Sequence, residues 1–120
     1  MTEEADRADC LFCRIADGEL AADRVTESDE WLAFRDIDPQ APVHVLIIPK
    51  RHVESVAALD SGDVELAGGL LLAAAETARE LGVEEDGYRL VTNRGAKAGQ
   101  SVFHLHVHLL AGRRMEWPPG

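Results

Sequence analysis

The chain has 120 residues, of which 46% are hydrophobic, and a formal net charge of −10 at pH 7. This length suits one domain with its own core and no need for disulfides. The acidic balance argues against a nucleic-acid polymer, because backbone phosphates are held by clusters of Lys and Arg. No apolar run approaches the roughly 20 residues of a membrane span. The opening MTEEADRAD has no basic segment followed by an apolar one, as a secretory signal would. We expect a cytoplasmic protein without membrane partners.

The N-terminal part is expected to begin with a mobile tail, residues 1–9, followed by a single domain over residues 10–120. Leu11–Ala16 can form one or two helical turns. Gly18 would end them in a left-handed conformation, as glycine commonly does after a helix.

Two strands are expected next in the chain. Trp31–Ile37 alternates apolar and polar residues, which is the pattern of a half-buried strand. Asp38–Pro42 predicts a turn, because proline fixes φ and biases the preceding residue away from helix. Val43–Ile48 is mostly apolar and β-branched and predicts a central strand that Pro49 ends.

The clearest helix is expected over Ser61–Leu81. Asp60 or Ser61 is a suitable N-cap, and Gly82 is a natural stop. One apolar face has helical spacing and comprises Val64, Ala67, Leu71, Ala74, Ala75 and Ala78. Gly68 and Gly69 weaken this helix, and either close backbone approach or an unexplained weakness can account for them.

Two further strands, Tyr88–Asn93 and Phe103–Ala111, are expected on either side of a glycine-rich loop, Arg94–Val102. Helical and strand segments do not alternate as they do in repeated βαβ units. The sequence therefore predicts an antiparallel α+β fold.

Three histidines stand on alternate residues near the end of the chain, at His104, His106 and His108. On a strand, alternate side chains share one face at a spacing of about 6.5–7 Å, so the imidazoles would act on one small ligand together. Imidazole can ligate a metal, attack as a nucleophile or transfer protons near neutral pH. The row therefore predicts a metal site or a catalytic site. Antiparallel pairing can also bring His44 beside it.

The loop Gly95–Ser101 directly precedes the histidines. Its glycines allow backbone N–H groups to turn toward an anion, and Ser101 adds a hydroxyl donor. A long hairpin connection is the alternative interpretation. Beside three histidines, we favour phosphate binding, with a neutral imidazole attacking phosphorus to form a covalent intermediate.

Cys10 and Cys13 form a C-x-x-C motif. In a reducing cytoplasm this spacing indicates a redox pair or half of a metal site rather than a structural disulfide. Two small buried residues beside the N-terminal helix are the alternative.

The segment GQSVFHLHVHLL resembles the signature of the histidine triad (HIT) superfamily. The similarity covers nearly the whole chain, from Leu11–Ile15 through AFRDIDPQAPVHVLIIPKRH to the ending MEWPPG. It implies a HIT-like fold: a five-stranded antiparallel sheet, one long helix and a short N-terminal helix. The most similar branch is that of the histidine triad nucleotide-binding proteins, which act as purine nucleoside phosphoramidases.

The resemblance implies an activity and roles for the histidines. The reaction would split the P–N bond of a purine nucleoside 5′-phosphoramidate, or the mixed anhydride of an aminoacyl-adenylate, and release a nucleoside monophosphate such as AMP. His106 would attack the α-phosphorus and His108 would bind the phosphate oxygens, while His44 supports both rings. This chemistry requires no metal, since preorganised donors stabilise the charge on the oxygens.

The resemblance also implies a nucleotide site. Its phosphate pocket would comprise Asn93, Gly99, Gln100 and Ser101. Asp36 would accept hydrogen bonds from the ribose hydroxyls. The purine slot would be lined by Phe12, Ile15, Phe34, Ile37 and Leu46, for which ordinary core packing is the alternative.

A structural zinc ion and a homodimer are further implications. His52 and His104 would complete a Cys₂His₂ site with Cys10 and Cys13, as in bacterial-type members that share the C-x-x-C. Animal members with the MEWPPG ending lack both cysteines, so the chain mixes features of two subgroups. In the dimer, two sheets would form a continuous ten-stranded one, the Ser61–Leu81 helix would pack across the interface, and Trp117 would reach toward the partner's active site.

Two other functions stay open. A zinc-dependent hydrolase would bind its metal on His104, His106 and His108, but three rings in a straight row cannot easily surround one ion. A nucleotide-sensing or scaffold module with little turnover would use the same pocket as the enzyme.

Overall fold

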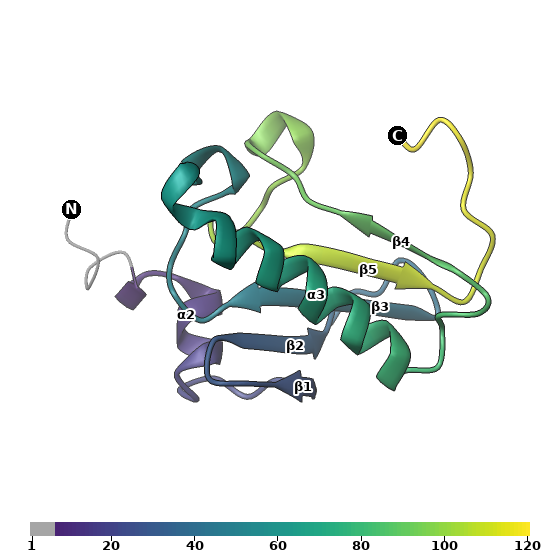
Figure 1. Cartoon of the computed structure of the whole chain (residues 1–120), viewed down its shortest axis with the longest axis horizontal. Coiled ribbons are helices and arrows are strands. Elements are labelled where there is room, and N and C mark those ends of the chain that lie inside the picture. The colour runs from purple at the N-terminus through teal and green to yellow at the C-terminus, as the bar shows by residue number, and fades with distance from the viewer. Residues whose placement is uncertain (1–6) are drawn as a thin grey trace.

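The computed structural model describes residues 7–120, and a five-stranded sheet organises them (Figure 1). The strand order is β1-β2-β3-β5-β4, and every neighbouring pair is antiparallel. The strands are β1 (Arg24–Glu27), β2 (Trp31–Arg35), β3 (Val43–Pro49), β4 (Tyr88–Val91) and β5 (Val107–Ala111). The predicted α+β class and the antiparallel sheet are confirmed.

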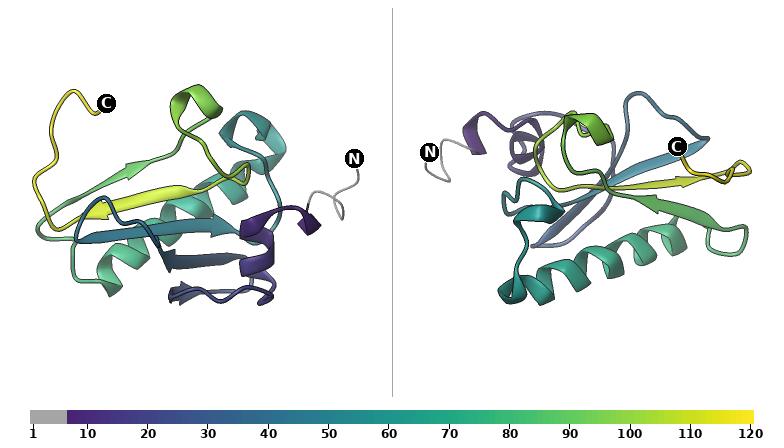
Figure 2. Two further views of the ribbon diagram at one scale, coloured as in Figure 1. Left: turned by 180° about the vertical axis from the view of Figure 1, so that it is seen from behind. Right: turned by 90° about the horizontal axis from the view of Figure 1, so that it is seen from above.

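Two α-helices cover opposite faces of this sheet. The long helix α3 (Val64–Glu80) lies across one face, and the short α2 (Leu11–Ala16) lies on the other (Figure 2). The described residues also form three 3₁₀ turns, η1 (Val56–Ala58), η2 (Ser61–Asp63) and η3 (Ala96–Ala98). Among the residues described, no helix is long and apolar enough to cross a membrane.

The central strand β3 is buried on both faces, which explains its nearly continuous apolar sequence. Val45 and Ile47 join the core beneath α3, whereas Leu46 and Ile48 join the core beneath α2. The sheet therefore separates two apolar clusters, and the histidines lie on the α2 side.

The 3₁₀ turn η2 leads directly into helix α3. At its start, the carboxylate of Asp63 accepts a hydrogen bond from the N–H of Asp60 at 3.1 Å. The predicted apolar face is only partly right. Ala74 is buried, but Val64 and Leu71 are 69% and 58% exposed. The buried stripe instead consists of Leu70, Ala74, Thr77 and Ala78. Thr77 takes part because its hydroxyl donates to the carbonyl of Ala73 at 2.7 Å and so does not remain unpaired.

The two glycines of α3 differ in their surroundings. A Cβ added to Gly69 would lie 2.5 Å from Cζ2 of Trp31, whereas one added to Gly68 would meet nothing within 4 Å. Close approach is therefore confirmed for Gly69 alone.

The predicted strands Trp31–Ile37 and Tyr88–Asn93 extend too far toward their C-termini, since β2 ends at Arg35 and β4 at Val91. The carboxylate of Asp36 accepts the N–H of Asp38 at 2.8 Å, which starts a turn.

The predicted strand Phe103–Ala111 begins too early, because β5 starts at Val107. Before it, the N–H of Leu105 donates to Val53, and the carbonyl of His106 accepts the hydroxyl of Thr92 at 2.8 Å. These backbone groups bond outside the sheet.

Residues 1–6 of the predicted mobile tail lie outside the described residues. Arg7 departs from that prediction, because its guanidinium donates to the carbonyl of Lys50 at 2.7 Å and to the carboxylate of Asp17 at 2.6 Å.

Candidate active site

The three alternating histidines project toward the α2 side, although only His108 lies on a strand. The residues between them, Leu105 and Val107, belong to the core beneath α3. The backbone thus keeps the alternation of a strand ahead of β5. The rings of His106 and His108 are neighbours, with centroids 5.0 Å apart.

His106 is held in one tautomer by the backbone. Its Nδ1 lies 2.6 Å from the carbonyl oxygen of His104. Since a carbonyl only accepts hydrogen bonds, Nδ1 carries the proton and Nε2 keeps a free lone pair. Burial lowers the pKa of His106 below its ordinary value and favours the neutral ring. Such an imidazole is suited to nucleophilic attack.

A second chain of hydrogen bonds fixes His44 and His108. The backbone N–H of Gln40 donates to Nδ1 of His44 at 3.0 Å, so a neutral His44 carries its proton on Nε2. That N–H donates to Nδ1 of His108 at 2.9 Å. His108 therefore presents its own Nε2–H as a donor. Burial, with nearby His106 and His44, lowers the pKa of His108 to about 4.

Asp36 stands beside this histidine pair. One carboxylate oxygen lies 3.4 Å from Nε2 of His44. Burial lowers the pKa of His44, and the charge of Asp36 opposes that shift. The pairing of β2 with β3 accounts for this proximity, since Asp36 follows β2 and its N–H donates to the carbonyl of His44.

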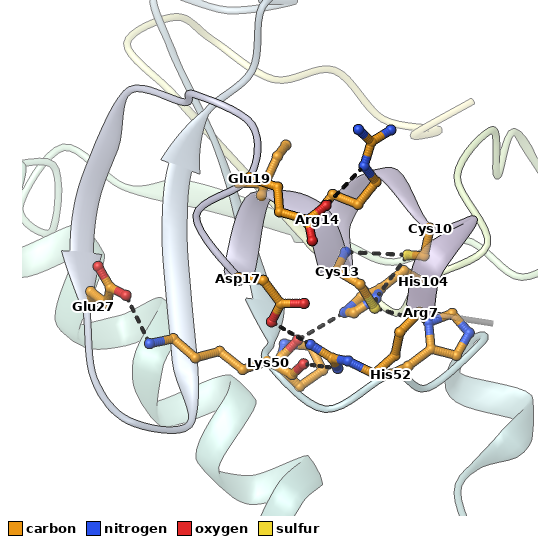
Figure 3. A network of polar contacts seen from close by, with 12 residues as sticks. Arg7, Cys10, Cys13, Arg14, Asp17, Glu19, Glu27, Lys50, His52 and His104 are labelled. Carbon is orange, nitrogen blue, oxygen red and sulfur yellow. Dashed lines mark hydrogen bonds and ion pairs between the residues drawn. The ribbon is translucent and has the colours of Figure 1, made fainter. Parts of the chain in front are cut away.

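The ring of His104 lies beside the two cysteines (Figure 3). Its Nε2 donates to the carbonyl of Pro49 at 2.8 Å, which leaves Nδ1 with the lone pair. Nδ1 lies 3.3 Å from Sγ of Cys10 and 3.4 Å from Sγ of Cys13. The Nδ1 of His52 lies 3.3 Å from Sγ of Cys13.

These four ligand atoms lie within 4.8 Å of one another and can hold a metal ion. Two thiols and two imidazoles are a donor set that suits tetrahedral zinc. The Cys10–Cys13 turn is already formed, because Sγ of Cys10 caps α2 by accepting the N–H of Cys13 at 3.3 Å. Burial, with a hydrogen bond that the Cys13 thiol donates to Cys10, raises the pKa of Cys13 to about 12. The residues fit a structural ion.

The HIT domain family matches residues 17–115 of the chain. The chain is 51% identical to an uncharacterized HIT-like protein of Synechocystis sp. over 112 residues, which cover 93% of this chain and 97% of the relative. This chain belongs to the HIT domain family. Its fold is similar to the solved HIT family hydrolase of Legionella pneumophila, with a TM-score of 0.91, 51% identity and coverage of 93% of this chain and 100% of that one. A HIT family hydrolase from Clostridium thermocellum gives a TM-score of 0.87 at 45% identity, with coverage of 90% and 94%.

The residues predicted to line the purine slot of this HIT domain fall into two groups. Phe12 packs edge-on against His106, with ring centroids 5.1 Å apart. A buried cluster around Phe12 also contains Ile15, Phe34 and Leu46. Ile37, the fifth residue predicted for the slot, is fully exposed, and Trp117, which was predicted to reach toward a partner's active site, is 81% exposed. The first group is assembled beside the candidate nucleophile, whereas the other two side chains stand in solvent.

The predicted phosphate loop of the HIT domain is held from inside by Gln100. This buried side chain accepts the N–H of Gly95 at 2.8 Å and donates to the carbonyls of Glu54 and Val102. Ser101 is exposed beside it. The Nδ2 of Asn93 lies 3.7 Å from where a Cβ of Gly99 would be, so these two predicted residues are neighbours.

Three positioning groups of the HIT domain were not found from the sequence: the N–H of Gln40, the carbonyl of Pro49 and the hydroxyl of Thr92. Two of them are backbone atoms, which every residue carries, so no side-chain pattern marks them. Thr92 lay in the predicted strand, but nothing in the sequence pointed to its bond with His106.

Proposed function

We propose that this HIT protein is a nucleotide-binding hydrolase that cleaves the P–N bond of purine nucleoside 5′-phosphoramidates. The mixed anhydride of an aminoacyl-adenylate is a related substrate. The main support for this proposal is the hydrogen bond from Nδ1 of His106 to the carbonyl of His104, which leaves Nε2 free for attack. The similar proteins of L. pneumophila and C. thermocellum are named hydrolases, which supports the reaction class.

In the first step, the Nε2 lone pair of His106 attacks the α-phosphorus. A phosphorus–nitrogen(imidazole) bond forms, the bond to the leaving amine breaks, and the amine takes up a proton from solvent. The Nε2–H of His108 donates to a phosphate oxygen, where negative charge is stabilised in the transition state.

In the second step, water attacks the same phosphorus and gives up a proton to solvent, the bond from phosphorus to Nε2 breaks, and His106 leaves as the neutral ring. The products are the nucleoside monophosphate and the free enzyme. Splitting one displacement into two lets the same histidine, already oriented by the backbone, serve both.

The nucleoside is placed by groups beside His106. We propose that Phe12, Ile15, Phe34 and Leu46 contact the purine, with Ile37 covering it. Asp36 would bind the ribose hydroxyls. Asn93, Gly99, Gln100 and Ser101 would form the phosphate pocket, in which Gln100 holds the loop through its internal hydrogen bonds.

We propose a structural zinc ion for Cys10, Cys13, His52 and His104. When bound, zinc would crosslink the segments that carry these four residues, and it would take no part in the reaction. The ion would hold His104, the residue whose carbonyl orients His106.

A homodimer in the cytoplasm completes the proposal. The outer face of α3 exposes Val64, Leu71 and Leu72, and such an apolar patch is suited to a subunit interface. Trp117 would then reach the partner's site.

A zinc-dependent hydrolase using all three triad histidines has less support. The described residues form two groups that could hold a metal, and neither contains all three. His104 points its free nitrogen at the cysteines, and His106 uses Nδ1 on a carbonyl.

The test is turnover of adenosine 5′-phosphoramidate, followed by release of AMP and amine. We expect His106→Ala to lose about a thousandfold or more in kcat, because the nucleophile is removed. Full activity in His106→Ala would overturn the mechanism. A protein that binds AMP yet releases no amine would be the sensing module instead. Complete loss of activity with chelator, restored by zinc, would favour the metal hydrolase, because loss of a structural ion should lower turnover only about tenfold.

A further inference from the structure

Cys10 and Cys13 are the only two cysteines of the chain, and both are free and buried. Their sulfur atoms lie within 4.8 Å of each other, and the proposed hydrolysis uses neither of them. We propose that this pair is a site of reversible oxidation, at which a hydroperoxide joins the two sulfurs in a disulfide and the proposed zinc ion is released. Disulfide formation does not depend on the proposed hydrolase, whereas its effect on turnover does.

The fold holds the two sulfur atoms close enough to react with each other (Figure 3). Sγ of Cys10 accepts the N–H of Cys13 at 3.3 Å, which closes the turn between them. Both sulfurs also lie against one nitrogen, Nδ1 of His104, at 3.3 Å and 3.4 Å. Groups held together in this way react with each other far faster than with a second molecule. A disulfide requires a sulfur–sulfur distance of about 2.05 Å, which rotation of the two side chains can supply.

Cys10 is the sulfur that an oxidant reaches first. It is one of the residues that line a hollow of about 830 Å³, and most of the others are exposed at the surface. Cys13 does not line this hollow and is 0% exposed. A small hydroperoxide therefore reacts with Cys10, and Cys13 reacts with the product. One attacked cysteine beside a second that resolves it is the usual arrangement of a redox-sensing pair.

With hydrogen peroxide the chemistry balances in two steps. In the first, sulfur of Cys10 attacks one oxygen, an S–O bond forms and the O–O bond breaks, and the thiol proton leaves with hydroxide as water. In the second, sulfur of Cys13 attacks the sulfenic acid, an S–S bond forms and the S–O bond breaks, and a second water leaves. The two thiols lose two electrons, and the peroxide is reduced to two molecules of water. An added dithiol reverses the oxidation by thiol–disulfide exchange.

The disulfide removes half of the ligands proposed for zinc. His52 and His104 are the two that remain of the four-residue cluster. Zinc is held by thiolates rather than by oxidised sulfur, and a structural site uses four ligands. The ion is therefore expected to leave when the pair is oxidised.

His104 connects the oxidised pair with the candidate nucleophile. Its ring lies against both sulfurs, and its carbonyl accepts the Nδ1–H of His106 at 2.6 Å. Loss of the ion and movement of the sulfurs should hold His104 less firmly. We expect turnover of the phosphoramidate to fall by about tenfold on oxidation and to recover when the thiols and zinc are restored.

The experiment treats the zinc-loaded wild type with hydrogen peroxide and follows intact mass, free thiols and released metal. The mass of the chain should fall by about 2 Da, because two hydrogen atoms are lost. Both thiols should stop reacting with a maleimide, and about one zinc ion per chain should reach a coloured chelator. Dithiothreitol with zinc should reverse all three changes. Thiols that survive the treatment, chains joined to one another, or a disulfide without release of zinc would overturn the proposal.

Two matched variants test the order of the steps, and each keeps four metal ligands because zinc accepts imidazole in place of thiolate. Cys13→His leaves Cys10 without its resolving partner. Its mass should rise by about 32 Da as Cys10 becomes a sulfinic acid, which dithiothreitol does not reverse. Cys10→His leaves only the enclosed Cys13, whose oxidation should be about tenfold slower or more. Equal rates in the two variants, or reversible oxidation of Cys13→His, would contradict the assigned roles.

Mass and metal release separate this proposal from the proposed function, because neither readout involves turnover. A wild type that forms the disulfide and releases zinc but hydrolyses no phosphoramidate would keep the oxidation site and overturn the hydrolase. A wild type that hydrolyses the phosphoramidate but retains both thiols in peroxide would keep the hydrolase and overturn the oxidation site.

Discussion

The carbonyl oxygen of His104 accepts the Nδ1–H of His106 at 2.6 Å, while the ring of the same His104 lies against the two cysteines. One residue therefore belongs to the candidate metal cluster through its side chain and to the candidate nucleophile through its backbone. A change at the cysteines should alter the reaction through this residue, since groups that hold a reacting side chain in place commonly tune its activity.

Replacing Cys13 tests this connection. We expect Cys13→Ser to lose most of the bound zinc, which should be about one ion per chain in the wild type. Stability should fall, since the proposed ion would crosslink α2, the segment after β3 and the residues before β5. Turnover should fall by about tenfold, because the backbone of His104 is held less firmly. Metal analysis, thermal melting and the phosphoramidate assay measure the three effects.

A matched control for Cys13→Ser is Arg14→Ala, which removes an exposed side chain of the same helix. It should retain zinc and activity. A wild type without zinc, together with an unchanged melting temperature in Cys13→Ser, would rule the metal site out.

His44 should act through His108 and not by touching the substrate. His44→Phe removes the N–H that donates to Nδ1 of His108, and we expect kcat to fall by about 10–100-fold. His44→Gln carries an N–H at a similar reach and should recover part of the loss. If the two variants are equally slow, with KM alone changed, the hydrogen bond from His44 does not position His108.

The sequence predicted those features that side-chain patterns encode. The C-x-x-C predicted half of a metal site, the resemblance to the HIT superfamily implied His52 and His104 as the other half, and the structure brings these four residues together. The antiparallel pairing that would bring His44 beside the triad is also confirmed. These predictions depend on residue types with few other uses.

Features that depend on the backbone were missed or misplaced. The strand β1 escaped notice because Arg24–Glu27 is a short edge strand with little apolar pattern. The start of β5 was set four residues too early, since bonds to Val53 and Thr92 replace the sheet there. On α3, the buried stripe is rotated relative to the predicted apolar face because it includes Thr77. This polar residue was not predicted to be buried, and its hydroxyl also forms a hydrogen bond with that of Thr26 at 2.9 Å.

Acid should destabilise the protein through His108. Its folded pKa of about 4 lies below the ordinary value of 6.5, so the unfolded chain binds the proton more readily. The contribution is fully present above pH 6.5 and is lost as pH falls toward 4. Urea unfolding at several pH values should show the free energy of unfolding decreasing through that window. His108→Gln, which does not titrate there, should show a shallower decrease, and an equal slope in both proteins would contradict the assignment.

The adjacent glycines of α3 should respond to alanine in opposite directions. Gly68→Ala adds a Cβ that meets nothing within 4 Å, and we expect about 0.5–1 kcal/mol of added stability from the better helix propensity. Gly69→Ala gains the same propensity but places its Cβ 2.5 Å from Cζ2 of the Trp31 indole. The rigid indole ring of Trp31, on β2, must then move away from α3. We therefore expect the free energy of unfolding to fall by about 1 kcal/mol or more. Chemical unfolding of both variants at pH 7 measures the difference. A gain of the same size in both would show that Trp31 moves freely and that Gly69 is not required for the packing of α3 on β2.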